Sequence, residues 1–371
     1  MVDDSSIQRI SRLTPLSEVL ALIDTRVSAV KPQQVELGQA LGCALAEDVI
    51  AGPLPPHPIA LRDGFGVEAA VLADAGPYMP VALPPTARRI DVGEPMPAGC
   101  DAVLPVDAVV LRSGRVEASA AVAPGEGVLA AGDDATPRTP LRRAGERLRG
   151  IDIAVIAAAG IKTVNVRAPR VGIVRAGPTQ PRVVEAAREL LIRAVTTAGG
   201  MPFGKALILV ASLDYERPDL VVAIGGTGSG RDDDGVRTLA RYGAVEAHGI
   251  AVSPGETAAL GFVDMRPVLL VPGRVDAALA HWLLIGRHAV AKLAGTKVED
   301  MPVTMLLKRK VTSAIGLTEL VPVVCADGIA NPLGSGYLSF ESLARSDGWI
   351  VVPADSEGFA EGTPVAVRPW P

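Results

Sequence analysis

An apolar run that ends in a series of glycines is the feature that most constrains this chain. Residues Asp219–Ile224 form a near-continuous hydrophobic segment, and Gly225-Gly226-Thr227-Gly228-Ser229-Gly230 follow at once, before Asp233 and Asp234. This order predicts a buried strand, a tight turn with exposed backbone N–H groups, and a helix whose positive dipole end faces the same point. Such a turn either holds an anion such as phosphate or is a plain strand-to-helix connection. The dinucleotide fingerprint and the Walker A lysine are both missing, so the pattern leaves the two interpretations open.

Composition excludes several classes of protein. The 371 residues are enough for two to four domains, and a hydrophobic content of 49% gives each a core. A formal net charge of −5 without a basic cluster argues against nucleic-acid or membrane-surface partners. The acidic N-terminus does not resemble a signal peptide, and the apolar runs are too short for a membrane span. Three distant cysteines are typical of reduced thiols, so we expect a cytoplasmic protein.

Alternating strand and helix patterns predict an α/β domain with a mostly parallel sheet. Apolar runs at Arg170–Val174, Ala206–Ala211, Asp219–Ile224 and Pro267–Val271 are the expected strands, and Arg182–Thr197 has helical spacing. A further helix is expected from about Val275 to Leu293. In sheets of this class, ligands bind at the carboxyl ends of the strands.

The rest of the chain predicts one helical part and two β-rich parts. Apolar residues recur at helical spacing over Leu16–Ile23, and short Val-rich runs broken by Gly and Pro follow. Near the C-terminus, short strands alternate with Asp-Gly and Gly-Ser-Gly turns, which is typical of a small barrel. The predicted domains are a discontinuous helical linker domain (residues 1–45 and 141–168), an inserted β-rich domain (46–140), the α/β domain (169–299) and a C-terminal β-barrel (300–371).

Six landmarks in order resemble those of the molybdopterin molybdenumtransferase family, which includes bacterial MoeA and the gephyrin E domain. They extend over nearly the whole chain. The landmarks are Asp63-Gly64-Phe65 with Val67, Gly93–Val103, Gly132-Asp133-Asp134, the glycine loop with Asp233, Val271-Pro272-Gly273, and Gly334-Ser335-Gly336 with Asp347-Gly348.

The resemblance implies a homodimer that acts in molybdenum cofactor biosynthesis. In this family adenylylated molybdopterin is hydrolysed and molybdate is inserted, with a divalent cation assisting; Mg²⁺ is our expectation here. A molybdoenzyme or another cofactor-biosynthesis protein is an expected partner. The apolar face of Leu16–Ile23 also favours a dimer. The implied cofactor-binding residues are Gly225, Gly226, Thr227, Gly228, Ser229, Gly230, Asp233, Pro254, Gly255, Pro272, Gly273 and Ser335.

Two acids are the predicted catalytic residues. Asp63 precedes a glycine at an expected turn and Asp134 lies in an expected loop, so both carboxylates are candidates for Mg²⁺ binding. A turn aspartate also commonly bonds to neighbouring backbone, and Asp233 also fits the cap of the helix after the glycines. Structural roles for these acids therefore stay open.

Several charged residues that the resemblance implies are missing. The segment Arg175–Gln180 lacks an expected acidic pair, Ser253 and Glu256 stand where lysines are expected, and Arg274-Val275 replaces Asn-Pro. At ~4 Å and an effective dielectric constant of 20, a charge reversal beside an anion amounts to several kcal/mol. Anion binding would then depend on Arg175 or Arg231, and we expect attenuated or altered molybdate insertion.

Three functions remain open. The first is a working or modified molybdopterin molybdenumtransferase-like enzyme, which the retained Asp63, Asp134 and Asp233 favour. The second is a non-catalytic protein on the same scaffold that binds molybdopterin or delivers a cofactor to a partner, which the lost lysines favour. The third is a protein whose glycine loop serves another phosphorylated small molecule. The order of the landmarks leads us to the first, with attenuated activity.

Overall fold

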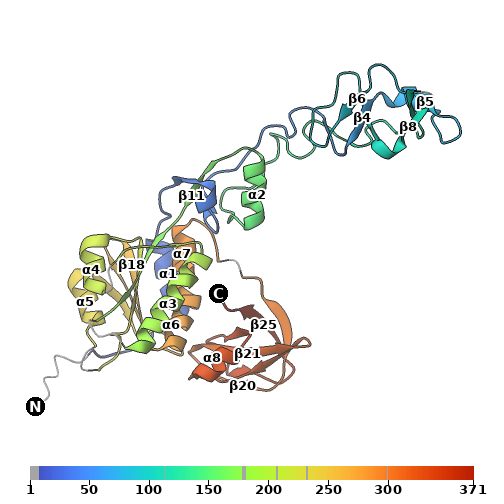
Figure 1. Ribbon diagram of the computed structural model, residues 1–371. Coiled ribbons are helices and arrows are strands. Elements are labelled where there is room, and N and C mark those ends of the chain that lie inside the picture. Colours follow the sequence, from blue (N-terminus) through green and yellow to red (C-terminus); the bar gives the residue numbers. More distant parts are fainter. Residues whose placement is uncertain (1–7, 113, 178–180, 206–207, 231–232, 299) are drawn as a thin grey trace, which may run out of the picture. The chain divides into compact units, whose positions relative to one another are not determined.

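The computed structural model describes residues 8–112, 114–177, 181–205, 208–230, 233–298 and 300–371. The chain forms two compact units (Figure 1). The first contains residues 1–46, 145–149 and 165–371, and the second contains residues 47–144 and 150–164. No helix within the described ranges is long and apolar enough to cross a membrane.

A six-stranded sheet forms the centre of the first unit, with the order β13-β12-β14-β18-β17-β15. Strands β13, β12, β14 and β18 are parallel, and β17 and β15 complete the sheet with antiparallel pairings. The sheet is thus mostly parallel, as expected. Its strands are β12 (Arg170–Arg175), β13 (Met201–Pro202), β14 (Leu220–Ile224), β15 (Ala244–His248), β17 (Ala259–Val263) and β18 (Arg266–Val271).

Helices cover both faces of this sheet, because alternate residues of each strand point to opposite sides. In β14, Leu220 and Val222 belong to one core and Val221 and Ala223 to the other. Figure 1 shows α1, α3, α6 and α7 on one side of β18 and α4 and α5 on the other. The bounds are α1 (Leu16–Arg26), α3 (Arg182–Thr197), α4 (Leu209–Ala211), η5 (Ser212–Glu216), α5 (Gly235–Tyr242), α6 (Val275–His281), η6 (Trp282–Gly286) and α7 (Arg287–Leu293).

One expected strand is wrong. Residues 206 and 207 lie outside the described residues, and Leu209–Ala211 is helical and continues into a π-helical turn, η5. Leu209 and Leu213 are buried in the core beneath the sheet. A short apolar run fits a buried helix turn as well as a strand, and packing decides between them. Within the described part of this segment, strand pairing is limited to the bridge between Ile208 and Arg175.

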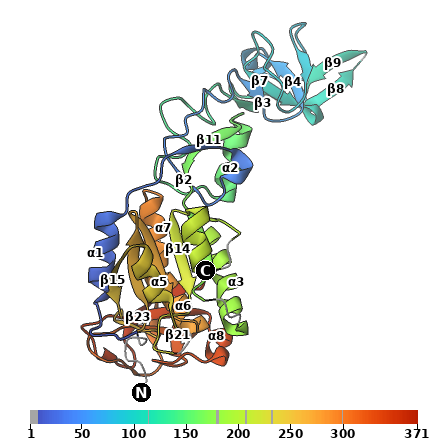
Figure 2. The same cartoon turned by 90° about the vertical axis from the view of Figure 1, so that its left-hand side faces the viewer.

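The C-terminal part of the first unit is a small five-stranded barrel, as expected. Each strand pairs with the next in the ring β21-β22-β19-β25-β23, and a β21–β23 pairing closes it. The short strand β16 adds to β21 in parallel. Figure 2 shows α8 beside β21. The elements are β16 (Val252–Ser253), β19 (Val303–Leu307), β20 (Val311–Thr312), β21 (Thr318–Ala326), β22 (Ile329–Pro332), α8 (Phe340–Arg345), β23 (Gly348–Val352), β24 (Gly358–Phe359) and β25 (Pro364–Pro369).

The second unit is rich in short strands, as the sequence predicts. Its small sheets have the orders β6-β4-β7, β5-β9-β8 and β10-β3. The division of the whole chain into four domains stays a prediction. The elements are β3 (Ile59–Ala60), β4 (Gly64–Val67), η3 (Ala69–Leu72), β5 (Val81–Ala82), β6 (Arg88–Ile90), β7 (Ala102–Pro105), η4 (Val106–Ala108), β8 (Val109–Arg112), β9 (Arg115–Ala118), β10 (Val128–Leu129) and α2 (Gly150–Ala158).

A separate small sheet contains residues from both ends of the long insertion. Strand β2 pairs with β11 through Leu45 with Val166 and Ala44 with Arg167. The bounds are β1 (Gln33–Glu36), η2 (Leu37–Gln39), β2 (Ala44–Leu45) and β11 (Thr163–Arg167).

Candidate functional site

A cavity of about 350 Å³ lies where β12, β14 and β18 reach their carboxyl ends. Open parallel sheets bind ligands at this edge. The cavity brings together Gly225–Gly228, Asp233 and the Pro272-Gly273 pair, all of which the sequence predicts for the site. Its lining residues are Arg175, Gly177, Pro181, Val184, Ile224, Gly225, Gly226, Thr227, Gly228, Asp233, Thr257, Pro272 and Gly273.

The glycine loop adopts a backbone that side chains would disturb. Gly225 and Gly226 have φ angles of 90° and 67°. A Cβ atom on Gly226 would lie 2.8 Å from Cβ of Ala176 and 2.9 Å from the backbone nitrogen of Gly235. The N–H of Gly235 also donates to the carbonyl oxygen of Gly226 at 3.0 Å, which ties the loop to the start of α5. The loop is therefore packed tightly against the helix that follows it.

Asp233 does not cap α5. The N-cap residue is Asp234, and Oδ2 of Asp233 instead accepts a 2.9 Å hydrogen bond from the N–H of Gly230. The carbonyl of Gly230 in turn accepts from the N–H of Asp233 at 3.1 Å. The helix begins one residue later than the capping interpretation requires. Asp233 therefore closes the glycine loop on itself, with its side chain at the cavity wall.

Gln8 also holds the loop, and sequence reasoning missed it. Its side chain is 8% exposed, and its Nε2 donates to the carbonyls of Gly226 and Gly228 at 3.0 and 2.8 Å. Its Oε1 accepts from the N–H of Arg237 in the first turn of α5 at 3.1 Å. These bonds bridge residues more than 200 positions apart, so no local pattern in the sequence signals them. Because Gln8 holds the carbonyls of Gly226 and Gly228, the backbone of the loop keeps a fixed orientation.

Gln8→Ala is expected to lower the free energy of unfolding of the first unit by about 2 kcal/mol, because it removes the hydrogen bonds of Gln8 to the carbonyl of Gly228 and to the N–H of Arg237, together with its bond to the carbonyl of Gly226. All three tryptophans of the chain, Trp282, Trp349 and Trp370, belong to that unit, so tryptophan fluorescence during urea unfolding reports on it. The exposed Gln39→Ala is the control, with a change within about 0.5 kcal/mol. If both variants changed the free energy of unfolding equally, Gln8 would not stabilise the glycine loop as described.

The loop after β16 reaches the cavity through a residue that the sequence did not single out. Oγ1 of Thr257 lies 2.9 Å from Oγ1 of Thr227, and both residues line the cavity. The predicted residues Pro254 and Gly255 do not line it. A Cβ on Gly255 would lie 2.8 Å from both Cβ of Ala277 and Cε1 of His281, so this glycine packs against α6.

Three other predicted residues, Ser229, Gly230 and Ser335, do not line the cavity. Ser229 belongs to the glycine loop and follows Gly228, the last glycine of the loop that lines the cavity. Ser335 is exposed on a turn of the barrel. That turn contacts α6, because the N–H of Leu338 donates to Oδ2 of Asp276 at 3.2 Å. The barrel turn is therefore held next to the loop that contains Gly273.

Of the two arginines expected to supply positive charge, one is placed at the cavity. Arg175 ends β12, is 4% exposed and lines the cavity. Arg231 lies outside the described residues, as do Pro178, Thr179 and Gln180. Ser253 is buried on β16 with 5% exposure, and the carboxylate of Glu256 accepts a 3.3 Å hydrogen bond from the N–H of Gly255. The residues at the two expected lysine positions are thus neutral and acidic, near a cavity whose described wall includes the buried Arg175.

The two predicted catalytic acids belong to the second unit. Asp63 and Asp134 are both exposed. Oδ1 of Asp63 accepts a 2.8 Å hydrogen bond from the backbone N–H of Val92, as a structural loop aspartate does. Among the described residues, no group of three or more His, Cys, Asp and Glu side chains is placed to hold a metal ion. Mg²⁺ binding by these acids therefore stays a prediction.

A buried histidine lies beneath the loop that contains Gly255. His281 is fully buried, and its Nδ1 lies 2.9 Å from the carbonyl oxygen of Ala277, which assigns the proton to Nδ1. Burial lowers the pKa of His281 to about 4, although the Ala277 carbonyl and the charge of Glu256 favour the protonated form. His281 is therefore neutral at pH 7.

The stability of the first unit is expected to fall by about 1.4 kcal/mol between pH 7.5 and 5.5 on account of His281. Its pKa is lower in the folded than in the unfolded chain, so the unfolded chain binds more protons as the pH falls from about 6.5 towards 4. Urea unfolding followed by tryptophan fluorescence at both pH values measures this. His281→Asn should remove that part of the decrease. If the free energy of unfolding of His281→Asn fell by the same amount between pH 7.5 and 5.5, His281 would not be the source of the decrease.

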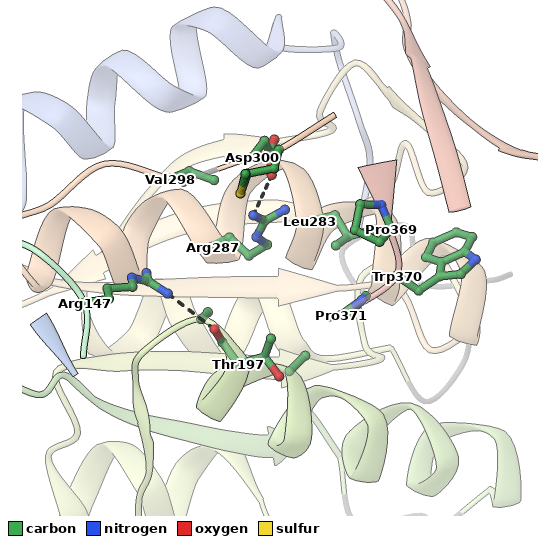
Figure 3. A pocket seen from close by; sticks show the side chains of 12 residues that line it. Arg147, Thr197, Leu283, Arg287, Val298, Asp300, Pro369, Trp370 and Pro371 are labelled. Atoms are coloured by element: carbon green, nitrogen blue, oxygen red, sulfur yellow. Dashed lines mark hydrogen bonds and ion pairs between the residues drawn. The ribbon is translucent and has the colours of Figure 1, made fainter. Parts of the chain in front are cut away.

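A second cavity of about 180 Å³ lies elsewhere in the first unit (Figure 3). Figure 3 shows Arg287 directed towards Asp300, and Nη2 of Arg287 lies 2.7 Å from Oδ1 of Asp300. Burial alone would raise the pKa of Asp300, but hydrogen bonds and charges of Arg287 and Arg368 outweigh it, so the pKa is lowered. The predicted site residues do not line this cavity, and its ion pairs connect α7 with the barrel.

A mostly parallel sheet, joined to a five-stranded barrel and a β-rich insertion, defines a multi-domain α/β protein with a cavity beside its glycine loop. A family model for the MoeA N-terminal region (domain I and II) matches residues 14–160, and one for the MoeA C-terminal region (domain IV) matches residues 304–370. Together they match more than half of the chain. The chain belongs to the MoeA family.

Curated relatives and solved structures agree with this family. Molybdopterin molybdenumtransferase 2 of Mycobacterium tuberculosis is 26% identical over 387 residues, which cover 91% of this chain and 95% of that protein. The molybdopterin molybdenumtransferase of Haemophilus influenzae is 24% identical with the same coverage. A crystal structure of the molybdopterin biosynthesis moeA protein from Pyrococcus horikoshii OT3 superposes with a TM-score of 0.73 at 24% identity, covering 97% of this chain and 100% of that one. The last comparison establishes the likeness in fold.

Proposed function

We propose that this protein acts in molybdenum cofactor biosynthesis and binds molybdopterin or its adenylylated form at the cavity beside the glycine loop. Membership of the MoeA family and relatives named molybdopterin molybdenumtransferase support this role. The reaction proposed is insertion of molybdate into adenylylated molybdopterin, with attenuated rate.

The observation that carries the proposal is the cavity at the carboxyl ends of β12, β14 and β18. Glycine loops at this edge of a parallel sheet commonly hold a phosphate group on their backbone N–H groups. Arg175 contributes a buried guanidinium to the same wall. A phosphate ester is the ligand group that we propose for this cavity, whose described wall contains the guanidinium of Arg175 and the carboxylate of Asp233.

Attenuation follows from the charges around the cavity. Thr257 is at the wall, and its neighbour Glu256 places a carboxylate where the family resemblance implies a lysine. Ser253 is neutral and buried. Because the stabilisation of developing charge usually contributes more to catalysis than any other effect, these replacements slow molybdate insertion.

Mg²⁺ is part of the proposal through Asp63 and Asp134. Mg²⁺ in enzymes is commonly held by one or two carboxylates together with substrate phosphate oxygens and water. Asp63 and Asp134 offer two exposed carboxylates of this kind. They would hold the ion, which would supply positive charge when bound.

A second function, a non-catalytic molybdopterin-binding or cofactor-delivery protein, is favoured by one observation. The carboxylate of Glu256 is hydrogen-bonded within its own loop, to the N–H of Gly255, so an acid is built into this position. Such a site would bind the neutral part of a ligand better than molybdate. A molybdoenzyme or another biosynthesis protein would then receive the cofactor.

Calorimetric titration with molybdopterin and with adenylylated molybdopterin, each with and without Mg²⁺, tests both functions. Binding that Mg²⁺ strengthens, followed by molybdate-dependent release of AMP from the adenylylated form, supports the attenuated enzyme. Binding without AMP release supports the carrier. If neither compound binds at millimolar concentration, the proposed function is wrong.

The homodimer remains a proposal that rests on the family resemblance. The apolar face of α1 gives it no support, since Val19 and Ile23 are fully buried within the chain's own core. Light scattering at micromolar concentration measures the oligomeric state. A monomer under those conditions would contradict the dimer.

A further inference from the structure

An arginine that follows a cavity-lining glycine in the sequence stacks on a tyrosine of the barrel turn. Gly273 lines the cavity, and the guanidinium carbon of the next residue, Arg274, lies 4.3 Å from the ring centroid of Tyr337. Consecutive Cα atoms are about 3.8 Å apart, so the backbone of Arg274 lies one residue beyond the lining residue Gly273. The pair joins the loop after β18 to the barrel turn that contains Ser335.

A buried carboxylate holds this pair in place. Asp276 is 1% exposed, and its Oδ2 accepts from Nη2 of Arg274 at 3.0 Å and from the N–H of Leu338 at 3.2 Å. One oxygen thus fixes both the arginine and the backbone next to Tyr337. Its other oxygen, Oδ1, has no hydrogen-bond partner among the described residues, which is uncommon for a buried acceptor.

Both members of the pair remain largely accessible. The side chain of Arg274 is 50% exposed, and Tyr337 is 63% exposed. Guanidinium planes and phenol rings both stack on flat aromatic systems, and a guanidinium adds charge attraction to the ring face. An exposed stack that begins at the residue after a cavity-lining glycine has the chemistry to receive a heterocycle.

We propose that Arg274 and Tyr337 form a stacking surface for the flat nitrogen heterocycle of a ligand whose phosphate lies at the glycine loop. The stacking surface rests on the proposed function. It explains how the protein would recognise the ring system of the ligand, which is adenine or pterin. Arg274 stands where the family resemblance implies asparagine. The surface is therefore a property of this chain, separate from the residues that the resemblance implies.

Titrations with three phosphate esters test the proposal. AMP carries a purine, neopterin monophosphate carries a pterin, and ribose 5-phosphate carries no heterocycle. The unmodified protein should bind AMP, the pterin ester or both about tenfold more tightly than ribose 5-phosphate, since stacking on an aromatic side chain has this size. The ester with the preference identifies the ring.

Variants of Tyr337 and Arg274 assign the preference to the stack. Tyr337→Leu should abolish the preference and leave ribose 5-phosphate affinity unchanged, while Tyr337→Phe should retain it. Arg274→Lys, which keeps the charge and removes the planar group, should reduce it. Tyr215→Leu, at another exposed tyrosine of the same unit, is the matched control and should change nothing.

The outcomes separate this proposal from the proposed function. Equal binding of all three esters, or a preference that survives Tyr337→Leu, would overturn the stacking surface and leave the phosphate site intact. If none of the three esters binds, the phosphate site itself is absent and both proposals fall. Loss of the heterocycle preference in Tyr337→Leu, with the preference kept in Tyr337→Phe and in the control Tyr215→Leu, establishes the surface.

Discussion

Gly226→Val is expected to lower the free energy of unfolding of the first unit by about 3 kcal/mol or more and to abolish phosphate binding. From the sequence alone, this substitution is expected to block the ligand and spare the fold. The packing shows otherwise, because an added Cβ would lie 2.9 Å from the backbone nitrogen of Gly235, at a φ angle of 67°. Urea unfolding followed by tryptophan fluorescence measures the stability loss.

Gly225→Ala separates binding from folding at the same loop. Gly225 also lines the cavity, but its added methyl group would meet no atom of the described residues within 4 Å. Only the left-handed backbone penalty remains, about 1 to 2 kcal/mol. This variant should stay folded and bind AMP at least about tenfold more weakly. Unchanged binding by folded Gly225→Ala would place the phosphate elsewhere.

Molybdate insertion by the unmodified chain is expected to be at least about 100-fold slower than in a family member with both lysines, the size of losing one preorganised group in a charged site. The rate of AMP release from adenylylated molybdopterin with molybdate measures this. Rescue of a strain that lacks its molybdenum transferase gives an independent measure. Full rescue by this chain, equal to that by an ordinary member, would contradict the expectation.

Glu256→Lys is the variant that should restore part of the missing positive charge and so strengthen phosphate binding. Replacing Ser253 by lysine as well is not suitable: Ser253 is 5% exposed on β16, so the lysine would bury its ammonium group. The double variant Ser253→Lys with Glu256→Lys is therefore expected to destabilise the barrel edge, where β16 pairs with β21. Reversal at Glu256 alone should raise affinity for ribose 5-phosphate by about tenfold, with the gain shrinking as salt is added. Glu361→Lys, an exposed barrel residue with the same change in net charge, is the control. An equal gain in the control would show a nonspecific charge effect.

The sequence predicts well those elements whose signals are local. Helix α3 begins and ends as expected, at Arg182 and Thr197, because Pro181 precedes it and Gly199-Gly200 follow it. The glycine loop and the Pro272-Gly273 pair meet at one cavity, since both follow neighbouring parallel strands. Periodicity did not separate the short helix α4 from a strand, because a short apolar run fits either.

Contacts that depend on distant parts of the chain escaped prediction. The bonds of Gln8 to the glycine loop and the stacking of Arg274 on Tyr337 join segments that only the tertiary fold brings together. The capping role considered for Asp233 was also wrong: the helix begins after Asp234, whose side chain makes no cap hydrogen bond among the described residues, and Asp233 accepts from the N–H of Gly230. Strands β15 and β17 were missed because the segment between the glycine loop and Pro267 carries no clear alternation.

The position of α1 has a consequence for biosynthesis of the chain. This helix is made long before its packing partners: Val19 and Ile23 are buried in a core that includes Ala289 and Val290 of α7, about 270 residues later. At roughly 5 to 20 residues per second, the ribosome delivers that partner only after tens of seconds. All residues of the second unit emerge within this interval and can fold before the sheet exists. The newborn chain therefore carries α1 with its apolar face uncovered while translation proceeds, and this helix can pack in its final place only after α7 has been made.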